Sequence, residues 1–271
     1  IMLQQTRVEA VKPYYDRFLK ELPDVKALAK VPEDRLLKLW EGLGYYNRAR
    51  NLKEAACQIM EEHGGVFPET YEDIRSLKGI GSYTAGAISS FAYGIPKPAV
   101  DGNVLRVVTR ITADADDIAK AGTKTKIEAA VEEVIPKDHA GDFNQSLIEL
   151  GALVCVPNGE PKCAECPVSC LCFAHAQGRE TEYPVKKKAK GRRIEKRTIL
   201  IFRDNDKTAI RKRPDTGLLA GMYEFPGREG HLKQAEVIEY AKEAGLMPVR
   251  VKRLGSAKHI FSHVEWHMIG Y

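Results

Sequence analysis

The feature that most constrains the fold is the run Leu-Lys-Gly-Ile-Gly-Ser-Tyr-Thr at residues 77–84. Gly79 and Gly81 flank one apolar residue, and because glycine has no Cβ, each can adopt the positive φ of a tight turn. Apolar side chains then recur at three- and four-residue spacing as far as Phe91, which predicts a helix. A glycine-rich turn that opens a helix directs backbone N–H groups outward, where they favour an anion. The sequence therefore predicts a hairpin that binds phosphate.

A carboxylate follows the predicted helix at the start of a second apolar segment. Asp101 comes directly before Gly102 and Asn103, and apolar residues recur from 104 to 108. An Asp at this place is a good N-cap, because its side chain accepts the first backbone N–H groups of a helix. It can also act as a reactive carboxylate beside a bound nucleic acid. The N-cap role explains the Asp but not its place behind a phosphate-binding hairpin, so both interpretations stand.

Composition sets broad limits on the class of protein. With 271 residues, 44% hydrophobic and 29% charged, the chain can form two ordinary domains of a soluble globular protein. No run approaches the roughly 18 apolar residues of a membrane helix, and the start carries no secretion signal. The net charge of +5 suits a nucleic-acid partner but is a weak indication by itself. Both ends lie inside patterned segments, so we expect the natural protein to extend beyond them.

Helix and strand signals divide the chain into two parts. Before residue 184 the apolar spacing is helical, and capping-box patterns at Thr70 and Thr125 predict two helix starts. Residues 184–197 carry eight basic residues and one acid, which indicates a linker. Beyond it the period changes to two, with a hairpin signal at 204–207 and a helix expected at 235–244.

Five of the six cysteines fall within eighteen residues, at positions 155, 163, 166, 170 and 172. A disulfide framework would spread through a shorter secreted chain, so this grouping favours a metal or cluster site. Four thiolates bind either zinc or an iron–sulfur cluster, and the spacing alone leaves both open. Cys57 lies in a predicted helix and is most simply a buried thiol.

Together these features resemble the helix-hairpin-helix DNA glycosylase superfamily, and within it the adenine DNA glycosylases of the MutY family. The superfamily has a Leu-x-Gly-apolar-Gly hairpin followed by Val-Asp-Gly-x-Val-x-Arg, which this chain carries at 77–81 and 100–106. Met-Leu-Gln-Gln-Thr at 2–6 resembles a motif of the adenine glycosylases. The resemblance extends over nearly the whole chain.

The resemblance implies a multidomain fold. Residues 1–183 would form a mainly α helix-hairpin-helix glycosylase domain with an iron–sulfur loop, and residues 184–197 a basic linker. Residues 198–271 would form an α+β Nudix-like domain that recognises 8-oxoguanine and is incomplete at its C-terminus. The helix expected at 235–244 lacks the Arg-Glu-x-x-Glu-Glu box of working Nudix hydrolases, so we expect no pyrophosphatase activity.

By resemblance, the reaction is hydrolysis of the bond between adenine and its sugar. Asp101 would stabilise the cationic sugar, while Tyr83 and Asn103 would help to place the water or nearby groups. The general acid that protonates adenine would be a Glu directly before Ile1, outside this chain. Bifunctional relatives carry Lys at the position of Tyr83 and form a Schiff base, so Tyr83 predicts a monofunctional enzyme.

The resemblance also assigns the residues that contact DNA. The pocket of the flipped base would be lined by Leu3, Val8, Gln145 and Ile148. A solvated Gln near the start of a helix explains Gln145 comparably well. The opposite base, including 8-oxoguanine, would be recognised by Gln5, Thr6, Leu43, Tyr45, Phe261, Ser262 and His263. The DNA backbone would be contacted by Lys78, Gly79, Gly81 and Arg48.

The cysteine pattern resembles the family's Cys-x6-Cys-x2-Cys-x5-Cys, which holds a [4Fe-4S] cluster. The four ligands would be Cys155, Cys163, Cys166 and Cys172. The first spacing is longer by one residue, which a loop rich in Pro, Gly and Asn absorbs, and Cys170 stays unligated. The cluster would have a structural role and clamp a loop whose Lys162 meets phosphate.

The implied substrate is adenine opposite 8-oxoguanine or guanine in double-stranded DNA, bound by a monomer without membrane contact. For a bacterial source the resemblance implies a cytoplasmic, nucleoid-associated protein that is not secreted. Three alternatives stay open: a fragment that binds DNA without cutting the glycosidic bond, an endonuclease-III-like bifunctional glycosylase, and a zinc-bound nucleic-acid-binding protein.

Overall fold

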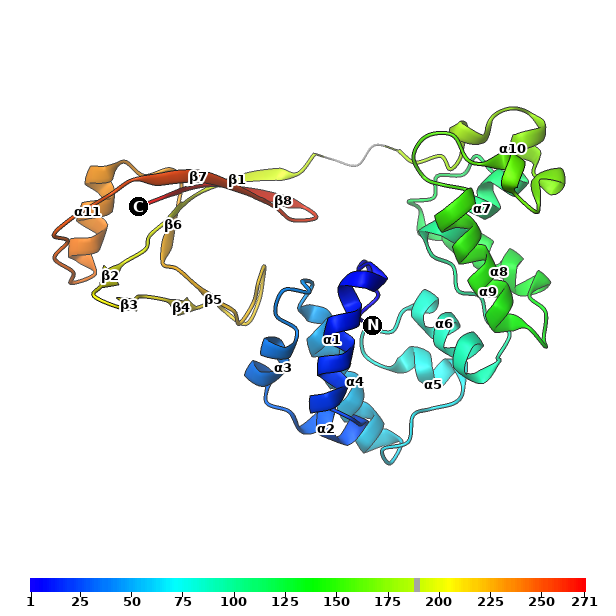
Figure 1. Ribbon diagram of the computed structural model, residues 1–271, viewed down its shortest axis with the longest axis horizontal. Coiled ribbons are helices and arrows are strands. Elements are labelled where there is room, and N and C mark those ends of the chain that lie inside the picture. The colour runs from blue at the N-terminus through cyan, green and yellow to red at the C-terminus, as the bar shows by residue number, and fades with distance from the viewer. Residues whose placement is uncertain (188–190) are drawn as a thin grey trace. The chain divides into compact units, whose positions relative to one another are not determined.

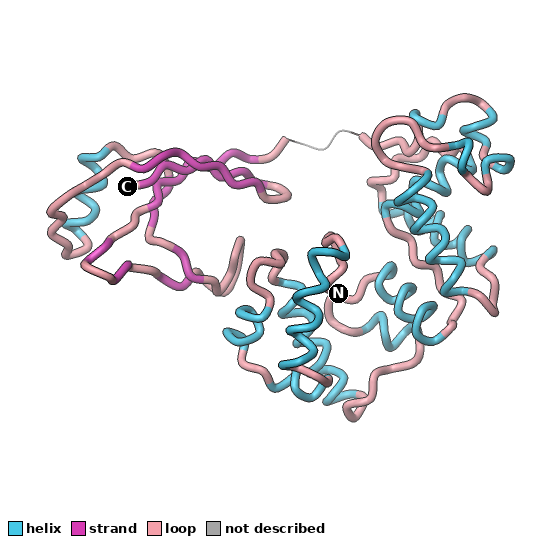
Figure 2. Tube along the Cα trace, in the orientation of Figure 1, coloured by secondary structure: helices cyan, strands magenta, loops and turns pink. Residues whose placement is uncertain are grey.

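The computed structural model describes residues 1–187 and 191–271. The chain divides into two compact units, Ile1–Lys187 and Lys188–Tyr271. Figure 1 labels the elements of each unit, and Figure 2 shows that the first unit is helical while the second carries the strands. This arrangement confirms the predicted order of a mainly α part followed by an α+β part.

The division between the units falls inside the segment 184–197 that the sequence predicts as a linker. Residues 188–190 of that segment lie outside the described part of the chain. Strand β1 (Arg193–Ile199) begins before the predicted start of the second domain at 198. The basic residues Arg193, Lys196 and Arg197 therefore belong to the sheet rather than to a linker.

The first four helices pack around one apolar core. They are α1 (Val8–Glu21), α2 (Val25–Lys30), α3 (Glu33–Leu39) and α4 (Asn47–Glu62). At the centre Trp40 is fully buried, and the Phe18 ring meets it edge-on with centroids 6.0 Å apart. Ile1 and Met2 pack against the same core, so the N-terminal motif is anchored to it.

The predicted hairpin joins α5 (Tyr71–Ser76) to α6 (Ser82–Tyr93). Thr70 caps α5 by accepting the Asp73 N–H at 3.2 Å, which confirms the first capping box. Gly79 has φ +76°, and a Cβ there would lie 2.7 Å from Asn51 Cβ. Gly81 instead has φ −90° as the N-cap of α6, so only the first glycine needs the left-handed region.

A second group of helices follows the hairpin. It comprises α7 (Gly102–Thr112), α8 (Ala121–Val134), α9 (Ala140–Glu149) and a π-helix, η1 (Leu150–Val154). The prediction that Thr125 starts a helix was wrong, because α8 begins at Ala121 and Thr125 donates to the Ala121 carbonyl at 3.2 Å inside it. Gly86 of α6 lies against Pro98, where a Cβ would be 1.9 Å from the carbonyl oxygen.

The cysteine segment forms short helical turns beside α7. They are η2 (Cys163–Glu165), η3 (Ser169–Leu171), α10 (Phe173–Ala176) and η4 (Glu180–Glu182). Within the described residues, no helix combines the length and apolar character needed to cross a membrane.

The second unit is built on a four-stranded sheet in the order β6-β1-β8-β7. Its other strands are β6 (Gly227–Glu229), β7 (Leu254–Ile260) and β8 (Val264–Gly270). β1 and β8 are parallel, whereas β6 and β7 pair antiparallel at the two edges. The remaining elements are β2 (Arg203–Asp204), β3 (Lys207–Thr208), β4 (Arg211–Lys212), β5 (Tyr223–Glu224) and α11 (Gln234–Glu243). The β2–β3 pair and α11 confirm the predicted hairpin and helix.

Candidate active site

Asp101 is both the N-cap of α7 and the centre of a polar cluster. Its Oδ1 accepts the backbone N–H groups of Asn103 at 2.8 Å and Val104 at 2.9 Å. Its Oδ2 accepts the Asn103 side-chain Nδ2 at 2.9 Å. Three donors therefore fix the plane of the carboxylate, which is only partly buried. The N-cap and the functional interpretation apply to the same side chain.

Asn103 is itself oriented by a buried arginine. Arg106 Nη2 donates to Asn103 Oδ1 at 2.9 Å, which turns the amide nitrogen toward Asp101. The same Nη2 donates to the Gly151 carbonyl at 2.6 Å, and Arg106 Nε donates to the Cys155 carbonyl at 2.7 Å. The planar guanidinium thus connects the Asp101 cluster with the start of the cysteine segment.

The π-helix η1 allows this contact because it brings Gly151 against Asn103. A Cβ on Gly151 would lie 2.5 Å from Asn103 Cβ and 3.0 Å from its carbonyl oxygen, so no larger residue fits without a shift. Neither Arg106 nor Gly151 has a role predicted from the sequence. Arg106 ends the Val-x-Arg part of the quoted motif, which was the available signal.

Tyr83 lies in the first turn of α6 and is half-buried. Burial raises the pKa of its phenol from the ordinary value, and the nearby charge of Asp101 raises it further. Tyr83 therefore lies close enough to Asp101 for the carboxylate charge to act on its phenol. Tyr83 keeps its proton near neutral pH and can donate a hydrogen bond but cannot act as an amine nucleophile.

The N-terminal motif lies beside the same helix. Gln4 Nε2 donates to Thr84 Oγ1 at 3.0 Å, which connects residue 4 with the residue after Tyr83. Gln5 has φ +56° and is exposed, and Leu3 and Val8 are each 56% exposed. Residues 2–6 are therefore held at α6 with several side chains free to meet a partner. Gln4, which the sequence analysis did not single out, makes this connection.

Arg48 is buried, whereas the sequence predicts that it contacts the DNA backbone. It is 9% exposed, and its Nη1 donates to the carbonyl oxygens of Met2 at 2.7 Å and of Ile1 at 3.2 Å, and also to Gln4. Its Nη2 donates to the Gly44 carbonyl at 3.2 Å. Arg48 is thus an internal clamp that shapes the N-terminal motif, because its guanidinium replaces the missing partners of these carbonyls.

Leu43, which the sequence predicts to contact the opposite base, lies in the protein core. Its side chain is 8% exposed and belongs to the core around Trp40, so it is not available to an opposite base. Tyr45, two residues later, has φ +49° and is 55% exposed. The loop therefore presents one of the two predicted side chains.

The other predicted DNA contacts lie at the surface in part. Gln145 is exposed, and its Nε2 donates to Glu149 Oε1 at 2.6 Å, as expected of a solvated glutamine on α9. Ile148 is partly buried against the core of α7 and α8. Lys78 is exposed beside the hairpin and forms an ion pair with Glu54 at 3.1 Å.

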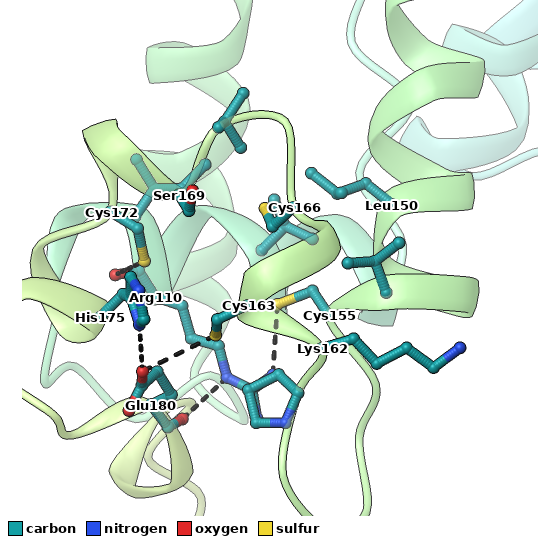
Figure 3. A pocket seen from close by; sticks show the side chains of 15 residues that line it. Arg110, Leu150, Cys155, Lys162, Cys163, Cys166, Ser169, Cys172, His175 and Glu180 are labelled. Atoms are coloured by element: carbon teal, nitrogen blue, oxygen red, sulfur yellow. Dashed lines mark hydrogen bonds and ion pairs between the residues drawn. The ribbon is translucent and has the colours of Figure 1, made fainter.

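The four predicted cysteine ligands line one pocket (Figure 3). Cys155, Cys163, Cys166 and Cys172 surround it together with apolar side chains that include Val107, Ile111 and Leu150. Cys170 is exposed and does not line the pocket. Burial, with the charge of Glu180 as a second cause, raises the pKa of the Cys163 thiol to about 11.

Arg110 of α7 also lines this pocket and connects two of its walls. Its Nη1 donates to Cys155 Sγ at 3.2 Å, and its Nε donates to the Glu180 carbonyl at 2.8 Å. Glu180 also contacts His175 Nδ1 at 2.5 Å. In the described chain, these last two residues and Cys163 form the group of candidate metal ligands whose ligand atoms lie within 4.8 Å of one another.

The predicted Phe-Ser-His loop connects β7 and β8 in the second unit. The Phe261 N–H donates to the Val264 carbonyl at 2.8 Å and closes a turn. Ser262 and His263 are exposed at its tip, whereas Phe261 is partly buried. His259 and His267 belong to β7 and β8, and neither joins the group of candidate metal ligands in the part of the chain that is described.

The comparisons with known proteins define the class. Residues 1–137 match the family described as "HhH-GPD superfamily base excision DNA repair protein", and residues 197–271 match the NUDIX domain. The chain is 34% identical to an adenine DNA glycosylase of Buchnera aphidicola subsp. Baizongia pistaciae, over 99% of this chain and 75% of that protein. It is 33% identical to the mouse adenine DNA glycosylase, over 98% of this chain and 61% of that protein.

The fold comparison agrees with the sequence comparison. A solved structure described as a non-covalent endonuclease III–DNA complex is 25% identical, with a TM-score of 0.57, and the match covers 65% of this chain and 81% of the other. The chain therefore belongs to the adenine DNA glycosylase family of the HhH-GPD superfamily. It spans 61% of the length of its mouse relative, so the activity of the whole protein is a matter for proposal.

Proposed function

We propose that this chain forms most of a monofunctional adenine DNA glycosylase, which hydrolyses the bond between adenine and deoxyribose in an A:8-oxoguanine or A:G pair. The observation that carries the proposal is the cluster of Asp101, Asn103 and Tyr83 beside the N-terminal motif. In support of it, Asn103 holds the Asp101 carboxylate, and the charge of this carboxylate acts on the protonated phenol of Tyr83 in the first turn of a hairpin helix. Such a site suits a cationic sugar rather than a Schiff base.

The chemistry divides between a carboxylate and an acid. As the glycosidic bond breaks, Asp101 stabilises positive charge on the sugar while adenine leaves with a proton from the acid. Water then adds to the sugar carbon, and the proton that it loses returns to the acid, which completes the hydrolysis. By resemblance, the acid would be a Glu that directly precedes Ile1 in the full protein. The hydrogen bond from Gln4, three residues after Ile1, to Thr84 beside Tyr83 supports this assignment. Tyr83 and Asn103 orient Asp101 and the incoming water.

The reaction is tested on a protein extended upstream of Ile1 so that it includes the proposed Glu. We expect release of free adenine from an A:8-oxoguanine duplex, with strand cleavage only after alkali treatment. Borohydride should trap no covalent complex, since no lysine occupies the Tyr83 position. DNA binding without adenine release would replace the proposal with that of a non-catalytic DNA-binding protein.

We further propose that the thiol pocket holds a [4Fe-4S] cluster through Cys155, Cys163, Cys166 and Cys172. A zinc ion bound by four cysteines needs sulfurs roughly 3.8 Å apart, because each Zn–S bond is about 2.3 Å long. In the described chain, no three of the four sulfurs lie within 4.8 Å of one another, which supports a larger group. The cluster would clamp the segment from 155 to 172 against α7.

A pair of matched cysteine variants tests the ligand set. Cys166→Ser should lose the broad visible absorption of the cluster together with its iron and sulfide. Cys170→Ser, which changes a nearby exposed thiol, should keep both. A colourless protein with one zinc ion per chain would overturn the cluster proposal, as would equal loss in the two variants.

DNA recognition is proposed for the exposed residues of the motif and loops. We propose that Gln5 and Tyr45, which are exposed and have positive φ, enter an opened duplex. We also propose that the exposed residues Ser262 and His263 contact the base opposite adenine. Gly79 and Lys78 would meet the DNA backbone at the hairpin. We propose that the protein acts on DNA as a monomer.

A further inference from the structure

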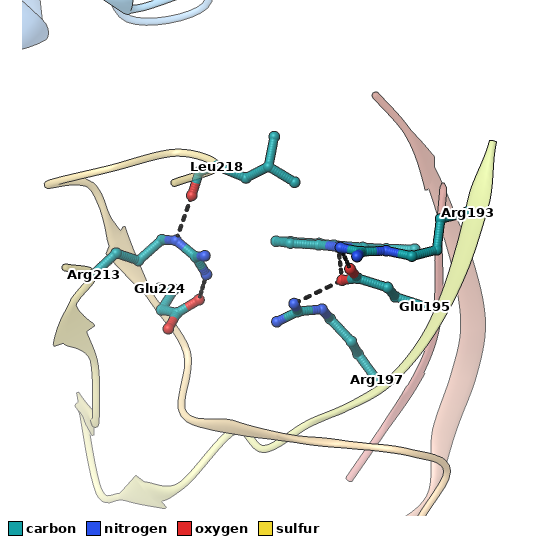
Figure 4. A network of polar contacts seen from close by, with 7 residues as sticks. Arg193, Glu195, Arg197, Arg213, Leu218 and Glu224 are labelled. Carbon is teal, nitrogen blue, oxygen red and sulfur yellow. Dashed lines mark hydrogen bonds and ion pairs between the residues drawn. The ribbon is translucent and has the colours of Figure 1, made fainter. Parts of the chain in front are cut away.

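The second unit contains a polar network that the proposed reaction does not use (Figure 4). Trp266 of β8 is only 7% exposed, and its indole Nε1 donates to Glu195 Oε2 at 2.9 Å. Glu195 lies on β1, in register with Trp266 across the parallel pair. Arg193 and Arg197 also donate to this carboxylate. The indole is therefore tied to the neighbouring strand through a charged acceptor.

Two cations further restrict the same ring. The Arg197 guanidinium carbon lies 4.0 Å from the Trp266 ring centroid, and that of Arg213 lies 5.5 Å from it. Arg213 is itself fixed, because its Nε donates to the Leu218 carbonyl at 2.9 Å and it forms an ion pair with Glu224. Cation–π contacts of partly buried groups add to the hydrogen bond, so Trp266 has one well-defined orientation.

Trp266 also contacts the Phe-Ser-His loop and restricts the position of its first residue. The Phe261 ring meets Trp266 edge-on, with centroids 4.9 Å apart and planes inclined by 68°. Phe261 begins the turn whose exposed tip is Ser262 and His263. The ring of Phe261 thus rests on an indole that the sheet holds in place and on the ring of His259, whereas the side chains of Ser262 and His263 are exposed.

We infer that Trp266 is a positioning residue for residues 261–263 and that it sets, through them, the preference for 8-oxoguanine opposite adenine. The inference rests on the proposed function, because it assumes that this loop contacts the opposite base. A preorganised loop loses less conformational freedom on binding, and that advantage applies only to the base for which Ser262 and His263 are arranged. Loss of the indole should therefore weaken discrimination more than binding itself.

The test measures dissociation constants of the full chain for duplexes that carry a non-cleavable 2′-fluoro-adenosine opposite 8-oxoguanine or guanine, at one salt concentration. We express discrimination as the dissociation constant for the guanine duplex divided by that for the 8-oxoguanine duplex. Trp266→Leu should lower this ratio by about tenfold and leave the dissociation constant for the guanine duplex unchanged. Trp266→Phe keeps an aromatic ring but loses the Nε1–H donor, so it should lower the same ratio by about threefold. Lys207→Ala, an exposed change in the β2–β3 hairpin, is the matched control and should change neither constant.

A double-mutant cycle separates positioning from general stability. In a chain that already carries Ser262→Ala and His263→Ala, adding Trp266→Leu should reduce discrimination no further, because both changes act through the same loop. Additive losses, or equal weakening of both duplexes, would overturn the inference. A native chain that binds the two duplexes equally would overturn the proposed loop recognition and this inference with it, whereas native discrimination retained in Trp266→Leu would overturn the inference alone.

Discussion

Arg106 donates a hydrogen bond of 2.9 Å to the side-chain oxygen of Asn103. This contact decides which end of the Asn103 amide faces Asp101, so it fixes the donor that the carboxylate receives. Arg106 also binds the carbonyls of Gly151 and Cys155. The orientation of Asp101 therefore depends on the position of the backbone at the start of the cysteine segment. The proposed [4Fe-4S] cluster would therefore affect the reaction by holding the cysteine segment in place, and it would take no part in the chemical step.

Replacement of Arg106 by lysine should leave DNA binding nearly intact and lower single-turnover adenine release by about 100-fold, the scale of a small misplacement of a reacting group. A lysine keeps the charge but lacks the planar fork that reaches Asn103, Gly151 and Cys155 together. Unpaired carbonyls in this buried region should also reduce the free energy of unfolding by about 2 kcal/mol. Unchanged turnover in a folded Arg106→Lys protein would remove the link from Arg106 to Asp101.

A methyl group on Gly151 should have a similar effect by a different route. Gly151→Ala would place a Cβ 2.5 Å from Asn103 Cβ, so Asn103 or the π-helix must shift. We expect adenine release to fall by about tenfold or more, with a loss of roughly 1 to 3 kcal/mol in unfolding free energy. Gly122→Ala is the control, because a Cβ there meets nothing within 4 Å and alanine favours the helix. Equal behaviour of the two variants would contradict the proposed contact.

Arg48 is predicted to stabilise the N-terminal motif without neutralising a phosphate. Arg48→Met should destabilise the protein by about 2 to 3 kcal/mol, because it leaves several carbonyls unpaired. The slope of log binding constant against log salt should stay unchanged, whereas loss of a phosphate contact would reduce it by about one. Lys78→Ala is the contrasting variant and should reduce that slope. A reduced slope in Arg48→Met would restore Arg48 as a DNA contact.

Tyr83 predicts a specific dependence of stability on pH. Its folded pKa is raised above the ordinary 10.0, so the folded state favours the neutral phenol. The resulting stabilisation is present below pH 10 and is lost as the pH rises toward the folded pKa. Urea unfolding gives the unfolding free energy of the native chain minus that of Tyr83→Phe, and this difference should be constant from pH 7 to 9. Above about pH 10 that difference should shrink, and a difference that grows with pH would contradict the environment described for Tyr83.

The sequence predicted those parts of the fold that depend on local signals. The positive φ of Gly79, the Thr70 cap, the β2–β3 hairpin and helix α11 follow from neighbouring residues alone. The prediction of a helix start at Thr125 was wrong because the residues before it also favour a helix, so α8 begins a turn earlier.

The parts of the site that were missed depend on distant partners. Arg48 was assigned to phosphate because its side chain suits one, but its acceptors are carbonyls more than forty residues away in the N-terminal motif. Leu43 likewise became a core residue through packing that no short pattern encodes. Arg106 stood inside a recognised motif, yet its role appears only when η1 brings Gly151 beside Asn103.

The central claim is that Asp101 supplies the carboxylate for hydrolysis of the adenine–sugar bond. The most direct measurement is single-turnover adenine release from an A:8-oxoguanine duplex by the upstream-extended protein and its Asp101→Asn variant. Asparagine can still accept the N–H groups of α7, so folding and DNA binding should be retained. We predict that release falls by about 1,000-fold, the scale of a lost electrostatic stabiliser. Release within a few-fold of the unsubstituted protein would contradict the account.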